Sequence, residues 1–194
     1  MQSGKEELLE VVSVRITQKI NDEKMLHFLV QDELKKYNAI HDMIRRQQYL
    51  VSRIAVKFLL GDTNLAVLNN QNGAPFIVGR NDINVSITHD NALVIVAISD
   101  KPVGIDFIHE SNFNKLPRWF ETNKNKVEKA VSWGAMECVF KLENPELRNV
   151  FSSDISKVEQ VDSDTWAISF TGNRFGAFAT KLKDGILAVS THME

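Results

Sequence analysis

One aspartate lies inside an apolar run of the sequence, VGIDFIHE, which spans Val103 to Glu110. Asp106 stands between Ile105 and Phe107. An acid in such a run needs a cation, a metal ion or several hydrogen-bond donors as partners. Two interpretations are open at this point. Asp106 either bonds loop amides at the end of a strand, or it holds a charged ligand.

A second group with chemical potential is the segment SWGAMECVFKLE. Trp133, Glu137 and Lys141 are spaced i, i+4 and i+8, so they lie along one face of a helix. An acid and a lysine one turn apart form either an ordinary solvated pair or, beside a tryptophan, a partly desolvated one. If Asp106 and Glu137 converge, their oxygens would suit Mg²⁺, which keeps several waters and accepts phosphate oxygens.

Two further sets of polar residues could bind an anion. His89 follows a strand-like run, and it is either a satisfied polar residue or a donor to a phosphate together with the Thr88 hydroxyl. The second set lies on one side of a predicted helix and comprises Arg45, Arg46, Arg53 and Lys57. These cations form either a solvated face or an anion-binding or partner-docking surface.

The elements that must position these residues follow an α+β order. Strands are predicted at 6–17, 83–90, 92–99, from 103, and at 155–161, 165–170, 174–182 and 186–191. Helices are predicted at 22–37, 41–61 and 126–142, the last ending before Asn144–Pro145. This order favours two α+β lobes, residues 1–101 and 102–194, that are pseudo-equivalent and each pack a helix on an antiparallel sheet.

Local signals mark the ends of several of these elements. The helix over 41–61 has an apolar stripe and a stop at Gly61. Its stripe consists of Met43, Leu50, Ile54 and Phe58. A turn is predicted between Asn69 and Pro75, and a tight hairpin turn around Asp90–Asn91.

Composition bounds the class of protein. The 194 residues are 43% hydrophobic and 25% charged with a net charge of −2, which is typical of globular proteins and gives no general attraction to nucleic acid or anionic membranes. The lone Cys138 excludes an internal disulfide and a zinc site of the cysteine type. The first ten residues lack a signal-peptide pattern, and no apolar run approaches the ~20 residues of a membrane span. A cytoplasmic protein is expected.

Four motifs in order resemble the 4′-phosphopantetheinyl transferase superfamily. They are N-G-A-P, INVSITHDNALVIVAIS, VGIDFI and WGAMECVFK. The family pattern is roughly G-K-P, a strand ending in S-H-S, G-[IV]-D-[IV]-E and W-x-x-K-E-A-x-x-K. The similarity covers about half of the chain, from Arg45 to Leu142, and the two-lobed order is similar to the monomeric branch of that family.

The resemblance implies an enzyme that transfers the phosphopantetheine arm of coenzyme A to a serine of an apo acyl or peptidyl carrier protein. It implies that Asp106 and Glu137 hold Mg²⁺ and that Glu137, or a metal-bound water beside it, takes the serine proton. It further implies that Lys141 steadies the pyrophosphate. The nucleotide-binding residues it implies are His89, Thr88, Arg45, Arg46 and Arg53. A monomer is expected, with no nucleic-acid or membrane partner.

Several positions depart from the family pattern. Ala74 and Met136 stand where the family has lysines, Ile108 stands in place of a second acid, and Thr88 and Asp90 flank His89 in place of serines. Thr88 keeps a hydroxyl, whereas the two lost lysines, the lost acid and the gained charge of Asp90 would each weaken a site built for a polyanion, by about 1 kcal/mol or more. Glu110 could contribute indirectly in place of the missing acid. The alternatives are therefore a relative that binds carrier protein or coenzyme A without transfer, and an enzyme for another acyl-coenzyme A or nucleotide.

Overall fold

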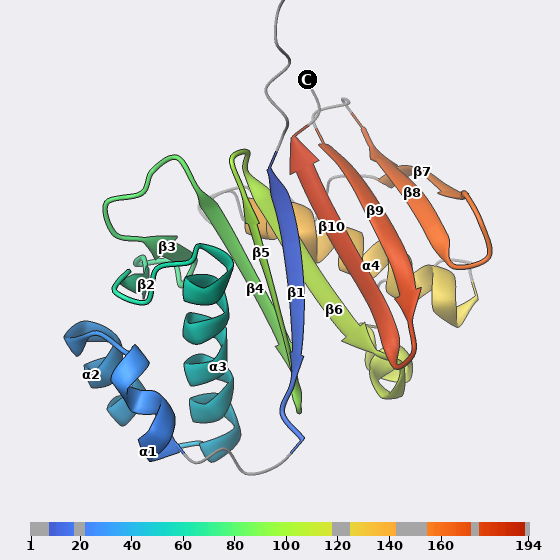
Figure 1. Cartoon of the computed structure of the whole chain (residues 1–194). Coiled ribbons are helices and arrows are strands. Elements are labelled where there is room, and N and C mark those ends of the chain that lie inside the picture. The colour runs from blue at the N-terminus through green and yellow to red at the C-terminus, as the bar shows by residue number, and fades with distance from the viewer. Residues whose placement is uncertain (1–7, 18–21, 118–124, 143–154, 172–174, 193–194) are drawn as a thin grey trace, which may run out of the picture. The chain divides into compact units, whose positions relative to one another are not determined.

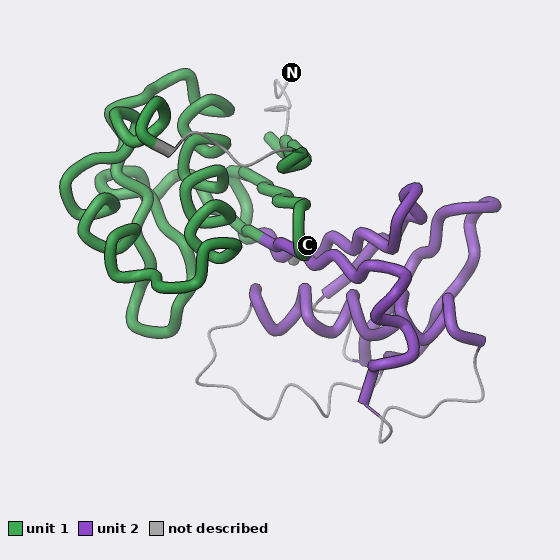
Figure 2. Tube along the Cα trace, turned by 90° about the horizontal axis from the view of Figure 1, so that it is seen from below, with its two compact units in different colours: residues 1–87, 91–102 green, residues 88–90, 103–194 purple. Residues whose placement is uncertain are grey.

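The computed structural model describes residues 8–17, 22–117, 125–142, 155–171 and 175–192. The chain divides into two compact units, which Figure 2 colours separately. Unit 1 contains residues 1–87 and 91–102, and unit 2 contains residues 88–90 and 103–194. The short segment Thr88–Asp90, at the end of a strand, thus belongs with unit 2.

Unit 1 is a three-stranded sheet with helices beside it (Figure 1). Its strands are β1 (Leu9–Arg15), β2 (Val67–Asn69), β3 (Pro75–Ile77), β4 (Asn84–Asp90, up to residue 87) and β5 (Leu93–Ser99). Its helices are α1 (Asp22–Met25), the short 3₁₀ helix η1 (Leu26–Phe28), α2 (Gln31–Ala39) and α3 (Met43–Leu59). The sheet order is β1-β5-β4, with β1 antiparallel to β5, while β2 and β3 form a separate two-stranded ribbon.

Helix α3 begins and ends at local signals in its sequence. The Asp42 side chain accepts a hydrogen bond from the Arg45 amide at 2.8 Å and so caps the N-terminus. Gly61, with a φ of 66°, follows the last turn in the left-handed conformation that favours glycine. The predicted stop is therefore confirmed.

The predicted apolar stripe of α3 is only partly correct. Leu50 and Ile54 are buried, whereas Met43 and Phe58 are 51% and 64% exposed. Met43 begins the helix, and Phe58 lines an open apolar pocket instead of the packed core. The stripe was thus predicted correctly for the middle turns, where the helix packs on the sheet.

Unit 2 is a five-stranded antiparallel sheet with one long helix. Its elements are β6 (Val103–His109), η2 (Glu110–Lys115), α4 (Lys126–Leu142), β7 (Ile155–Gln160), β8 (Thr165–Phe170), β9 (Phe175–Leu182) and β10 (Gly185–His192). The sheet order is β6-β10-β9-β8-β7, with α4 packed chiefly over β6 and β10. The core under α4 includes Ala135, Cys138, Val139, Ile168 and Ala188.

Close approach of α4 to the sheet depends on glycine. A Cβ built on Gly104 of β6 would lie 2.0 Å from the carbonyl oxygen of Cys138, so any larger residue would push the helix away. Gly134 of α4 lies over Ile108 and Ala188, whose side chains would be 3.5 and 3.2 Å from an added Cβ. These two contacts set the height of α4 above β6.

The structure confirms the α+β class with antiparallel sheets. The helix at 126–142 and the hairpin at Asp90–Asn91 agree with the sequence prediction, and Asn91 has a φ of 45°. The helix predicted over 22–37 is instead divided into α1, η1 and α2, and the turn predicted at 69–75 lies inside the β2–β3 ribbon. The predicted helix stop at Asn144–Pro145 lies outside the described residues. None of the described helices has both the length and the apolarity to cross a membrane.

Candidate functional site

Asp106, on β6, forms an ion pair with the last turn of α4. The Lys141 ammonium lies 2.8 Å from Asp106 Oδ1 and donates a second hydrogen bond, also 2.8 Å, to the Ile105 carbonyl. Both side chains reach solvent, with 29% of Lys141 and 16% of Asp106 exposed. Asp106 therefore uses a lysine from a distant helix as its partner, and the loop amides considered from the sequence are not its partners among the described residues.

The backbone packing explains why these two side chains meet. The Cys138 carbonyl rests on Gly104, and Lys141 follows one helical turn later, while Asp106 follows two residues further along β6. The Cys138 thiol also donates to the Ala188 carbonyl at 3.1 Å, and burial raises its pKa well above the usual value. This cysteine is an anchor for the helix and not a nucleophile.

Thr88 bonds the same oxygen of Asp106 as Lys141 does. Its hydroxyl accepts a hydrogen bond from the Phe107 amide and donates one to Asp106 Oδ1, both at 3.2 Å. Thr88 is buried, so these two protein contacts replace the hydrogen bonds that its hydroxyl would make to water. The side chain predicted to contact a nucleotide phosphate is thus engaged in positioning the carboxylate.

Glu137 lies one turn before Lys141 on α4, yet the lysine donates to Asp106 instead. Burial and the nearby charge of Asp106 raise the pKa of Glu137, and Lys141 partly offsets them. Within the described residues the Glu137 carboxylate has no hydrogen bond. The solvated pair of Glu137 and Lys141 considered from the sequence therefore does not form, because Lys141 pairs with Asp106.

The donor set can be tested against a divalent cation. Lys141 and Thr88 both bond to Oδ1 of Asp106, which leaves Oδ2 and the Glu137 carboxylate without protein donors in the described part of the chain. A cation completed by water or phosphate oxygens would favour the ionised form of Glu137, whose pKa burial and the charge of Asp106 raise. Among the described residues no cluster of three or more His, Cys, Asp or Glu side chains could hold a metal ion by itself.

The residues that depart from the family pattern have structural roles. Ile108 and Met136 are buried in the core between α4 and the sheet, so the hydrocarbon side chains pack where the family has an acid and a lysine. Ala74 lies in the β2–β3 turn, where its amide donates a hydrogen bond to Asn70 Oδ1, and its methyl side chain supplies no positive charge. Glu110 is exposed at the start of η2.

His89 and Asp90 end strand β4. Because successive side chains in a strand point to opposite faces, His89 points away from the side on which Thr88 meets Asp106, and it is exposed. The Asp90 carboxylate accepts a hydrogen bond from the Asn112 side chain at 3.0 Å. Asn112, in η2, is a residue that the sequence did not single out.

The basic residues of α3 differ sharply in exposure. Arg45 is exposed, whereas Arg53 is buried and donates to the Val67 carbonyl, the Ser52 hydroxyl and the Asn69 side chain. Its guanidinium also stacks 4.1 Å from the Tyr49 ring centroid, and burial lowers its pKa. Arg53 thus holds the β2–β3 ribbon.

Arg46 and Lys57 complete this set. The Arg46 guanidinium lies 5.4 Å from the Tyr37 ring centroid, and its buried Nε atom has no hydrogen-bond partner in the part of the chain that the structure describes. Lys57 is 1% exposed and pairs with Glu33 of α2 at 2.6 Å. A solvated face is therefore the wrong interpretation for Arg53 and Lys57, because α2 and the β2–β3 ribbon cover that side of α3.

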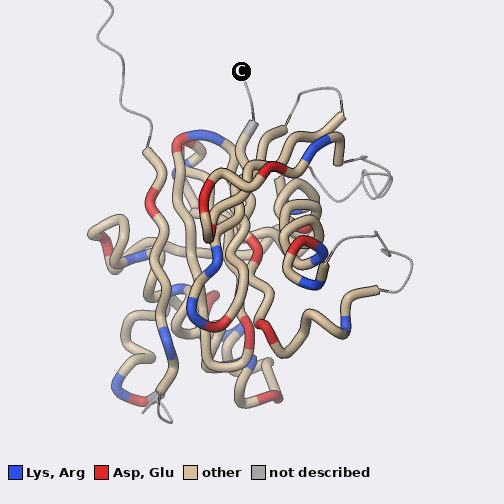
Figure 3. The backbone as a smooth tube through the Cα atoms, turned by 90° about the vertical axis from the view of Figure 1, so that its right-hand side faces the viewer, with Lys and Arg blue, Asp and Glu red and all other residues tan. Residues whose placement is uncertain are grey.

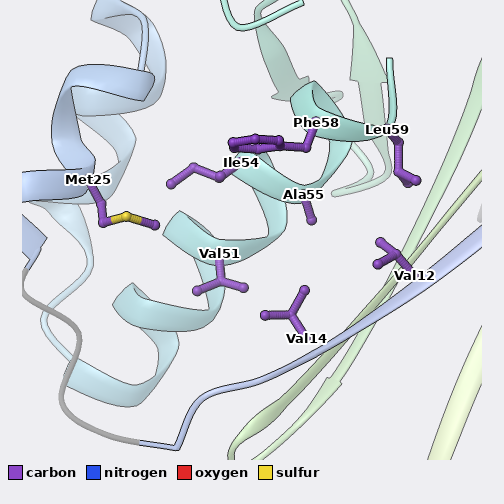
Figure 4. A pocket seen from close by; sticks show the side chains of 8 residues that line it. All are labelled: Val12, Val14, Met25, Val51, Ile54, Ala55, Phe58 and Leu59. Atoms are coloured by element: carbon purple, nitrogen blue, oxygen red, sulfur yellow. The ribbon is translucent and has the colours of Figure 1, made fainter. Parts of the chain in front are cut away.

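Unit 1 also contains an apolar pocket that the sequence did not reveal. Its volume is about 400 Å³, and its wall consists of Val12, Val14, Met25, Val51, Ile54, Ala55, Phe58 and Leu59 (Figure 4). Alternation in β1 was the sequence signal available for this pocket, since Val12 and Val14 point to one side of that strand.

Charged residues of both signs are spread along the chain and not gathered in one segment (Figure 3).

No protein-family model matches this chain, and no curated protein is significantly similar to it.

Proposed function

We propose that this chain is a 4′-phosphopantetheinyl transferase that acts on a serine of an apo acyl or peptidyl carrier protein. The observation that carries the proposal is the group formed by Asp106, Glu137 and Lys141, two carboxylates and a lysine at one end of α4. These are the positions at which the sequence resembles the family's metal-binding and phosphate-binding residues. The proposal includes the two-lobed family fold, a monomer and a cytoplasmic location.

The proposed reaction needs charge control more than covalent catalysis. The serine Oγ bonds to the phosphorus that carries pantetheine, and the bond from that phosphorus to the bridging oxygen breaks. Adenosine 3′,5′-bisphosphate leaves with the extra negative charge, and Lys141 is the cation of the site available to offset it. Arg45, Arg46 and His89 remain proposed contacts of the nucleotide.

Glu137 is suited to take the proton of the serine. Burial, first, and the charge of Asp106 raise its pKa, which makes the ionised carboxylate a stronger base than that of an ordinary glutamate. Asp106 and Glu137 are also the residues that would hold Mg²⁺, which when bound would neutralise pyrophosphate charge. Thr88 and Phe107 keep the Asp106 carboxylate in a fixed orientation for that task.

A relative that binds coenzyme A or a carrier protein without transfer is the second candidate. Burial of Ile108 and Met136 in the core favours this second candidate. Apolar side chains fill the positions where the family pattern has an acid and a lysine, and no small movement of these side chains supplies the missing charges. Engagement of Arg53 with the β2–β3 ribbon removes one further cation from the predicted set. The two candidates differ in transfer and not in binding.

Intact-mass measurement separates these candidates. The protein is incubated with coenzyme A, Mg²⁺ and a panel of apo carrier proteins from fatty-acid, polyketide and peptide synthesis. A mass gain equal to the phosphopantetheine arm, lost in Glu137→Gln and retained in Glu128→Gln on the same helix, supports transfer. Coenzyme A binding by calorimetry without any mass gain supports the second candidate, and neither binding nor transfer removes both.

A further inference from the structure

The Lys141 ammonium already bonds Oδ1 of the carboxylate whose oxygens a metal ion would use. It lies 2.8 Å from Asp106 Oδ1, and among the described residues it also donates to the Ile105 carbonyl at the same distance. A divalent cation at Asp106 and Glu137 would therefore meet a positive charge within the same site. Like charges at such separations repel strongly where solvent is partly excluded.

We propose that Lys141 is an exchangeable counter-cation of Asp106, and that metal and coenzyme A binding are coupled through its movement. This inference rests on the proposed function. With the site empty of ligands, Lys141 neutralises Asp106. When metal binds, the ammonium leaves the carboxylate and becomes available to the pyrophosphate of coenzyme A, which favours it electrostatically.

Two features of the pair make exchange feasible. Lys141 is 29% exposed and lies in the last turn of α4, so its four-carbon side chain can reach solvent without unpacking the core. The pair is also far less enclosed than the Lys57–Glu33 pair, so water can solvate the separated charges and releasing the ammonium costs less than it would at Lys57. Lys57, at 1% exposure, has neither property.

Exchange makes a prediction that a fixed lysine does not. A lysine that stays in place would lower the affinity for the metal and raise the affinity for coenzyme A. These two effects would be independent, so the lysine would not change how much one ligand strengthens binding of the other. A lysine that moves from Asp106 to the pyrophosphate makes each ligand strengthen the other by the same factor. The coupling factor therefore distinguishes the two cases.

The test measures Mn²⁺ affinity by electron paramagnetic resonance, with and without coenzyme A, in the absence of any carrier protein. The proteins are wild type, Lys141→Met, Lys141→Gln and the control Lys126→Met, an exposed lysine in the first turn of the same helix. Binding of Mn²⁺ to free coenzyme A is measured separately and subtracted. Circular dichroism checks that each variant is folded, and the glutamine variant replaces the methionine variant if the latter is not.

We expect Mn²⁺ alone to bind Lys141→Met several-fold more tightly than wild type. Coenzyme A should then tighten Mn²⁺ binding at least about fivefold more in wild type and Lys126→Met than in Lys141→Met. Equal coupling in all proteins would show a fixed charge and overturn the inference while leaving the proposed function in place. Absence of Mn²⁺ binding in every protein, with and without coenzyme A, would remove the metal site of the proposed function and the inference together.

Discussion

Two lysine–carboxylate pairs, one in each unit, have similar chemistry and opposite surroundings. Lys57 and Glu33 lie 2.6 Å apart with 1% and 0% of their side chains exposed. Lys141 and Asp106 lie 2.8 Å apart with 29% and 16% exposed. The first pair is enclosed by protein, and the second borders solvent.

The enclosed pair is saturated with hydrogen bonds. Glu33 accepts from the Val30 and Val67 amides at 2.9 and 2.8 Å, and Lys57 also donates to the Phe28 carbonyl at 2.5 Å. In the other pair the second oxygen of Asp106 has no hydrogen-bond donor among the described residues. The difference teaches that burial and saturation identify a structural ion pair, whereas spare acceptors beside solvent identify one that a ligand can join.

The largest expected effect is on the enclosed pair. Lys57→Met should lower the free energy of unfolding by about 3–5 kcal/mol, because it leaves the Glu33 charge buried without its cation. Urea denaturation measures this, with Lys35→Met as control, since Lys35 pairs with Asp32 on the exposed face of α2 and its loss should cost less than about 1 kcal/mol. Equal costs for the two variants would contradict the structural role of the Lys57 pair.

The next effect concerns the hydroxyl that fixes Asp106. Thr88→Val should cost about 1–3 kcal/mol, because the Phe107 amide loses its acceptor inside the protein. Thr88→Ser keeps the hydroxyl and should recover most of this loss. The control is Thr180→Val in β9, whose side chain makes no hydrogen bond in the described ranges. A cost for Thr88→Val no greater than for the control would rule out the positioning role.

A smaller effect is expected at Lys141. Removing this partly exposed lysine by Lys141→Met should cost no more than about 1 kcal/mol, far less than the same change at Lys57. Thermal and urea unfolding, with Lys126→Met as the control on the same helix, give the comparison directly. A loss as large as that of Lys57→Met would make both pairs structural and would weaken the case for exchange.

The smallest effect is a pH-dependent gain. Burial and Asp106 raise the pKa of Glu137 from its usual 4.5. A carboxyl with a raised folded pKa gives its full contribution to stability below the unfolded pKa and loses it as pH rises through the folded value. Glu137→Gln should therefore stabilise the protein at pH 7, by less than about 1 kcal/mol after screening by solvent, and should give no gain near pH 4.

Urea denaturation at both pH values checks this last prediction. Glu128→Gln controls for loss of a negative charge from α4. A gain of equal size at pH 4 and pH 7 would mean that ionisation of Glu137 is not its cause. Burial and the charge of Asp106 would then destabilise the ionised carboxylate less than expected.

Prediction from the sequence succeeded where local signals were strong. The observed span of α4 agrees with the predicted one, and the start of β6 follows the break at Pro102. It failed for β2 and β3, three-residue strands without a readable alternation that Arg53 helps to hold. It also failed to divide the helix predicted over 22–37, because the Glu33 side chain caps the Val30 amide and starts a new helix there.

The sequence singled out three residues of the candidate site, but not the bonds that they make. Asp106 was visible as an acid in an apolar run, and Glu137 and Lys141 as neighbours on one helix face. The spacing paired the lysine with Glu137, whereas the fold pairs it with Asp106. Thr88 was expected to face a phosphate and instead faces that carboxylate.

The sequence by itself determined the α+β class and the presence of the helix now seen as α4, because these depend on neighbours a few positions apart. Only the tertiary structure decided which cations are buried and which carboxylate Lys141 meets. Arg53 and Lys57 are enclosed by α2 and the β2–β3 ribbon, which no local pattern on α3 records. Lys141 reaches Asp106 because Gly104 lets α4 lie directly on β6, a contact between segments more than 30 residues apart.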